Sequence, residues 1–113
     1  FRGRVAGQGL GIGEQQLGGP ISSQLAQGSA AIAYVRPHEL EILPADAPGG
    51  ISATITRLLP MGPRIRVELR GDGETRGAHY EAELSKEAAR AFAPGQGVRL
   101  VARHAQLYPD YQI

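Results

Sequence analysis

One short segment concentrates the side chains that could carry out chemistry. Arg36, His38, Glu39 and Glu41 fall within six residues, interrupted by Pro37. An arginine fork binds carboxylates, backbone carbonyls or oxyanions. The segment could therefore be a catalytic cluster, an anion-binding cluster, or a structural corner that carries charges.

Pro37 favours the corner. Proline has no N–H and a fixed φ, and it biases the residue before it, Arg36, to extended geometry. An apolar, strand-like run ends at this point and apolar residues resume within 40–43. Arg36 would then project from a strand end, with Glu39 and Glu41 close in sequence. We expect a salt bridge at this corner, and the alternative is an anion or subunit contact.

The three histidines, His38, His79 and His104, do not form a recognised metal motif. None stands in an H-x-H, H-x-x-x-H or H-E-x-x-H pattern, so we expect no metal site. Ser22 and Ser23 lack the surroundings of a nucleophile elbow. We therefore predict that this chain contains no catalytic residue.

The glycine-rich stretch GQGLGIG (7–13) resembles a nucleotide-binding loop only at first sight. A dinucleotide fingerprint needs glycines at positions one, three and six before a helix, but the sixth position here is Ile12. The sequence also contains no G-x-x-x-x-G-K-[ST] loop. We expect glycines on the crowded face of a twisted strand, and no cofactor in this chain.

Composition excludes several classes of protein. The chain has 113 residues, enough for one domain, and no cysteine, so disulfides and thiolate metal sites are excluded. Twelve Lys+Arg against eleven Asp+Glu leave a net charge of +1, which argues against a nucleic-acid partner. No apolar stretch is long enough to span a membrane. Because Phe1 replaces an initiator Met and no signal peptide follows, we expect a fragment of a longer chain.

Short alternating segments separated by turn residues predict a mainly β fold. FRGRV and GLGIG indicate an N-terminal hairpin, which EQQLGGP would end in a turn. Ser85 is a suitable N-cap for one short helix over 86–92. The remaining strands are expected at 29–35 (buried), 39–43, 51–59, 64–70, 79–84 and 97–103.

The order β-β-β-short helix-β after residue 51 predicts a small Greek-key barrel of the OB type. The barrel needs a fifth strand, from the first half of the chain or from its tail. We therefore expect one domain over 1–113. It consists of an N-terminal β part with a hairpin (1–43), a Pro/Gly-rich connector (44–50) and the β-β-β-α-β part (51–113).

Two segments resemble a known family. VRPHELEI (35–42) is similar to the TOBE (transport-associated OB) domain, the C-terminal regulatory region of ABC-importer ATP-binding subunits, in which an Arg-Pro precedes acidic and apolar residues. LSKEAARAFAPGQGVRLVARHAQLY (84–108) resembles the closing helix, turn and last strand of that family. Its ending, ARHAQLY (102–108), most resembles the sulfate/thiosulfate branch.

The resemblance implies a regulatory and dimer-contact domain rather than an enzyme. The parent subunit would be a sulfate-transporting ATPase, peripheral on the cytoplasmic face of the membrane, with ATP and Mg in an N-terminal domain absent from this chain. Implied partners are a second copy in a homodimer, the permease subunits and an oxyanion effector.

Four residues are candidates for anion binding or an interface. Arg36 and His38 come from the matching motif, and Arg103 and His104 come from the matching terminal strand. Two other functions stay open. One is a free-standing OB-type module for a small oxyanion or nucleic acid, and the other is a regulatory domain of a polyamine, iron or sugar importer.

Overall fold

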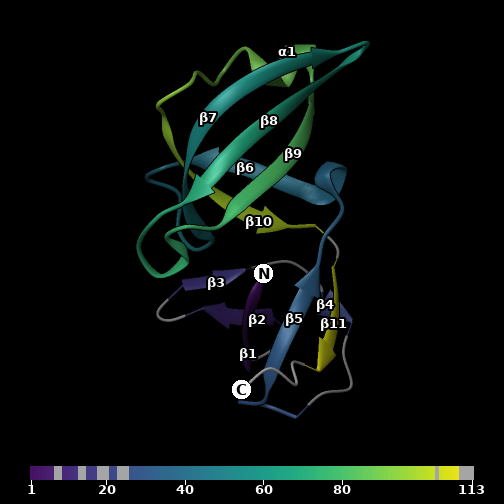
Figure 1. Ribbon diagram of the computed structural model, residues 1–113, viewed down its shortest axis with the longest axis vertical. Helices are drawn as coiled ribbons and strands as arrows, with labels where there is room; N and C mark the ends of the chain where they lie inside the picture. Colours follow the sequence, from purple (N-terminus) through teal and green to yellow (C-terminus); the bar gives the residue numbers. More distant parts are fainter. Residues whose placement is uncertain (7–8, 13–14, 18–20, 23–25, 104, 110–113) are drawn as a thin grey trace.

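The chain folds into two β-sheets that lie at opposite ends of the molecule (Figure 1). The computed structural model describes residues 1–113 except 7–8, 13–14, 18–20, 23–25, 104 and 110–113. The six-stranded sheet contains, in spatial order, β3 (Gln15–Leu17), β2 (Gly9–Ile12), β1 (Arg2–Ala6), β5 (Ala30–Tyr34), β11 (Ala105–Pro109) and β4 (Ile21–Ser22). The five-stranded sheet, here called the barrel sheet, contains β6 (Leu40–Pro44), β10 (Gly97–Ala102), β7 (Ile51–Met61), β8 (Arg64–Gly71) and β9 (His79–Ser85).

The six-stranded sheet begins with the predicted hairpin. β1 and β2 pair antiparallel, with Val5 opposite Leu10. A Cβ on Gly3 would collide with the carbonyl oxygen of Gly11, which agrees with the expected crowding of glycines on this strand pair. The turn predicted from EQQLGGP (14–20) is wrong for Gln15–Leu17, because β3 continues the sheet there, and residues 14 and 18–20 lie outside the described residues. Leu17 is fully buried, and this apolar contact outweighs the local turn signal.

β5 is the predicted strand 29–35, but it is buried on one face only. Ala31 and Ala33 are buried, whereas Tyr34 is 62% exposed. The small alanines hid this alternation in the sequence, because an alanine fits either face of a sheet. β5 pairs with β1 on one side and with β11 on the other, so it holds the two ends of the chain in one sheet.

The barrel sheet confirms the mainly β, OB-type prediction. β7, β8 and β9 form a meander, α1 (Lys86–Ala89) follows, and β10 returns to pair with β7. The fifth strand is β6, from the first half of the chain, with Ile42 opposite Leu100 of β10. β6 and the 3₁₀ turn η1 (Pro37–Glu39) also pack against β9, so the two edges of the sheet meet.

The alternation of the sequence places the core of the barrel correctly. Ile51, Ala53 and Ile55 of β7 are at most 1% exposed. Val67 and Leu69 of β8 are buried in the same core. These aliphatic side chains drive the sheet to close, because removing their surface from water stabilises the folded chain.

The single helix starts where predicted and ends early. The Oγ of Ser85 accepts a hydrogen bond from the backbone N–H of Ala88 at 3.1 Å, which confirms the N-cap. The N–H groups of residues 90–92 bond three residues back rather than four, so the segment tightens beyond Ala89. In the part of the chain that is described, no helix is long and apolar enough to cross a membrane.

Candidate functional site

The predicted site residues lie where the chain passes between the two sheets. The first crossing, residues 35–39, joins β5 to β6 and carries Arg36 and His38. The second crossing leads from β10 to β11 and carries Arg103. The fourth candidate, His104, lies outside the described residues.

The two crossings run side by side. The backbone N–H of Arg103 donates to the carbonyl oxygen of Glu39 at 2.7 Å. The Nε of Arg103 lies 3.7 Å from a carboxylate oxygen of Glu41. On the barrel side of the crossings Ala102 stands opposite Leu40. The fold therefore brings three of the four predicted residues, two from one crossing and one from the other, to the same junction.

The predicted corner is present, but its expected ion pair is not. Arg36 is extended (φ −72°, ψ 148°), as expected before a proline, and its carbonyl oxygen accepts from the N–H of Glu39 at 2.8 Å. Glu39 lies 3.8 Å from His38, and Glu41 faces Arg103 instead. The 3₁₀ turn between Arg36 and β6 breaks the strand alternation, so sequence distance did not predict the partners.

The junction is open to solvent, and its two arginines, Arg36 and Arg103, are balanced in formal charge by Glu39 and Glu41. Arg36 is exposed and has no ion pair or side-chain hydrogen bond within the described ranges. The side chains of His38 and Arg103 are 52% and 66% exposed. Exposed ion pairs at such distances contribute only about 0–1 kcal/mol, so Arg103 can exchange Glu41 for another anion. His, Asp and Glu side chains form no metal-binding group among the residues described.

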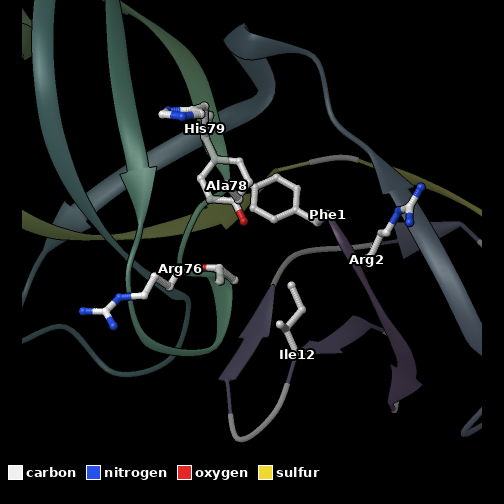
Figure 2. A pocket seen from close by; sticks show the side chains of 8 residues that line it. Phe1, Arg2, Ile12, Arg76, Ala78 and His79 are labelled. Atoms are coloured by element: carbon white, nitrogen blue, oxygen red, sulfur yellow. The ribbon is translucent and has the colours of Figure 1, made fainter.

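A second feature is a hollow of about 420 Å³ between the two sheets, here called the inter-sheet hollow (Figure 2). One wall comes from the start of the six-stranded sheet and the other from the loop and strand around β9. The Phe1 and Tyr80 rings stack across the boundary, with centroids 4.3 Å apart and planes 11° from parallel. The lining residues are Phe1, Arg2, Ile12, Thr75, Arg76, Ala78, His79 and Tyr80.

The Tyr80 hydroxyl is affected by this setting. Partial burial raises the pKa of Tyr80 above its usual value of 10.0, and a hydrogen bond with Thr75 acts in the opposite direction. Sequence reasoning did not find this hollow. The proximity of Tyr80 and Arg76 to Phe1 depends on how the two sheets meet, which no local pattern in the sequence encodes.

Family comparisons agree with the fold. Residues 45–103 match the TOBE-like domain, and residues 1–42 match the CysA C-terminal regulatory domain. The chain belongs to the TOBE-like domain family. The resemblance to the regulatory region of an ABC-importer ATP-binding subunit, on the sulfate/thiosulfate branch, is thereby confirmed.

Individual relatives of the chain are also sulfate/thiosulfate import ATP-binding proteins. The chain is 38% identical over 110 residues to the sulfate/thiosulfate import ATP-binding protein CysA 1 of Chromobacterium violaceum, a match over 96% of this chain and 30% of that protein. It is 36% identical over 115 residues to CysA of Nitrosomonas europaea, covering 98% of this chain and 31% of that protein. The chain thus spans less than a third of the length of these relatives.

A solved structure supports the fold. The cytoplasmic molybdate-binding protein ModG, with molybdate bound, aligns with a TM-score of 0.69 over 97% of this chain and 94% of that chain. Sequence identity is 20%, so the likeness concerns the fold alone.

Proposed function

We propose that this regulatory domain serves the ATP-binding subunit of a sulfate/thiosulfate importer. The parent subunit hydrolyses ATP, with Mg, in a domain outside this chain, and the chain itself is not an enzyme. The observation that carries the proposal is the match of nearly the whole chain to sulfate/thiosulfate import ATP-binding proteins. The parent works as a peripheral component on the cytoplasmic face of the membrane, together with permease subunits.

Residues 1–113 act in this proposal as one regulatory module. The Oε1 of Gln15 in β3 accepts a hydrogen bond from the N–H of Ser52 in β7 at 3.1 Å, which joins the two sheets at a point away from the crossings. A displacement of one sheet would therefore change the position of the other. This property suits a domain that reports an effector to the rest of a transporter.

The partner of the module is a second copy of the same subunit. Support comes from the outer face of the six-stranded sheet, where Tyr34 and Tyr108 form an edge-on aromatic pair with centroids 5.3 Å apart. Their side chains are 62% and 46% exposed, and with Ile32 and Pro109 they line a second hollow. Exposed aromatic surface of this kind is enriched at protein interfaces.

The effector in this proposal is an oxyanion at the two crossings. Arg36 has no competing carboxylate among the described residues, and His38 and Arg103 are held only by weak surface pairs. His104 remains the fourth candidate. An anion bound by both crossings would stabilise one arrangement of the sheets and shift the population toward it.

Isothermal titration of the 113-residue chain with sulfate, thiosulfate and molybdate tests the effector site. We expect saturable heat that Arg36→Gln and Arg103→Gln each reduce. Arg90→Gln is the matched control, because this exposed arginine lies beyond α1, outside both crossings. Absence of heat above the blank at millimolar anion, or an equal loss with Arg90→Gln, would overturn the oxyanion site.

A further inference from the structure

The inter-sheet hollow has the size and lining of a small-ligand site. Ligand pockets usually measure roughly 300–1,000 Å³, are mostly apolar, and occur where two structural units meet. This hollow measures about 420 Å³ and lies between the two sheets. Ile12 and Ala78 line it on either side (Figure 2), and the stacked Phe1 and Tyr80 rings, in contact with each other, also line it.

The polar groups within the walls are already satisfied. Thr75 is 8% exposed, and its hydroxyl donates to the carbonyl oxygen of Asp72 at 3.1 Å. The walls therefore present mainly carbon atoms to a bound ligand, and this favours a ligand with an apolar part.

The rim of the hollow is positively charged. Arg2 and Arg76 are exposed and lie on opposite sides of the hollow, with His79 above it, and their guanidinium groups extend outward from Phe1 and Ile12 (Figure 2). No carboxylate is among its described lining residues, and neither arginine has an ion pair there. Three arginines of the barrel sheet do have one: Arg57 with Glu68 at 2.8 Å, Arg66 with Glu81 at 3.9 Å and Arg70 with Asp72 at 3.9 Å.

The apolar walls and the unpaired arginines together favour one class of ligand, a molecule with both an apolar part and a negative charge. A bare inorganic oxyanion would leave the apolar walls uncovered, and a neutral apolar molecule would leave the guanidinium groups unpaired. We propose that the inter-sheet hollow binds a small organic anion, a carboxylate or sulfonate on a short, flat apolar body. Arg76 pairs with the acid group, and the body packs against Ile12 and the edges of the stacked Phe1 and Tyr80 rings. To do so the exposed Arg76 side chain turns from its outward position toward the mouth, and no ion pair among the described residues holds it back.

A guest in this position would couple the two sheets. It would contact Ile12 of the six-stranded sheet and Ala78 beside β9, next to the stacked Phe1 and Tyr80 rings, so it would stabilise this arrangement of the sheets by mass action. This site shares no residue with the crossings. A negative binding result at this site can therefore be distinguished from a negative binding result at the oxyanion site.

Sodium benzoate is a suitable probe, titrated into the ¹⁵N-labelled chain and followed by amide chemical shifts. Benzamide has nearly the same shape without the charge, and sulfate has the charge without the body. We expect saturable shifts in residues 75–80 and in Arg2 and Ile12 with benzoate, weaker binding of benzamide, and no saturable shift at these residues with sulfate. Arg76→Gln should weaken benzoate binding by about three- to tenfold, since it removes one charge-assisted hydrogen bond that solvent partly screens.

Two further variants separate the site from general charge effects. Ala78→Leu fills the hollow but keeps its cations, and it should abolish the benzoate shifts while sulfate heats at the crossings stay unchanged. Arg90→Gln removes one positive charge elsewhere and should leave benzoate binding unchanged. The proposal is overturned by equal binding of benzoate and benzamide, by equal losses in Arg76→Gln and Arg90→Gln, or by no saturation at about 20 mM benzoate.

Discussion

The backbone N–H of Arg103 donates to the carbonyl oxygen of Glu39 at 2.7 Å, and this bond ties together the two passages between the sheets. Both residues belong to crossings that are far apart in sequence. The bond depends on the backbone of Arg103, whereas the ion pair with Glu41 depends on its exposed side chain. The two contributions can therefore be measured separately.

Arg103→Pro removes the N–H and should lower the free energy of unfolding by about 1–3 kcal/mol, because the Glu39 carbonyl loses its donor. Arg103→Ala keeps the N–H and should cost less than about 1 kcal/mol, the value of an exposed ion pair. Urea denaturation of both variants gives the comparison. Equal costs for the two substitutions would show that the side chain, rather than the backbone bond, holds the crossings.

Gly71 and Gly97 predict opposite responses to alanine. A Cβ on Gly71 would collide with the carbonyl and side chain of buried Thr75, whereas a Cβ on Gly97 meets no atom within 4 Å. Gly71→Ala should therefore destabilise the chain by about 1–3 kcal/mol, as overpacking does. Gly97→Ala should be neutral or stabilise by up to about 1 kcal/mol, because it restricts the unfolded chain. Thermal melts followed by circular dichroism test both, and the prediction fails if Gly97→Ala is the more harmful change.

The barrel core should respond as an aliphatic core. Ile55→Ala should lower the free energy of unfolding by about 2–5 kcal/mol, because Ile55 is 1% exposed and its loss leaves a cavity. Met61→Ala, at the exposed tip of the β7–β8 hairpin, is the control and should change it by less than about 0.5 kcal/mol. Met61 is 50% exposed. A Met61 effect as large as that of Ile55 in chemical denaturation would contradict this assignment of the core.

These core residues were the part that the sequence predicted best. Alternation at period two depends only on neighbouring residues, so Ile51, Ala53 and Ile55 could be assigned to one face before the fold was known. The N-cap at Ser85 could be predicted for the same reason, because it depends only on residues close to it in sequence. The resemblance then supplied the OB-type architecture, which local patterns could only suggest.

The relationships that failed or were missed are long-range. Arg36 was expected to pair with a nearby glutamate, but Glu41 pairs with Arg103, which is distant in sequence. The inter-sheet hollow depends on Phe1 meeting Tyr80, and no local pattern encodes that meeting. The site residues could be named from motifs, whereas their partners required the packing of two sheets.

Tyr80 gives a final prediction about alkaline pH. Burial raises its pKa in the folded state above the usual value of 10.0, so the unfolded chain releases this proton first. Stability from this residue is therefore complete below about pH 10 and is lost as pH rises through the higher folded pKa. We expect the wild type to lose stability more steeply than Tyr80→Phe above pH 10, in chemical denaturation at several pH values. The difference in absorbance at 295 nm between wild type and Tyr80→Phe should titrate above pH 10. Parallel stability profiles for the two proteins would contradict the burial of this hydroxyl between the sheets.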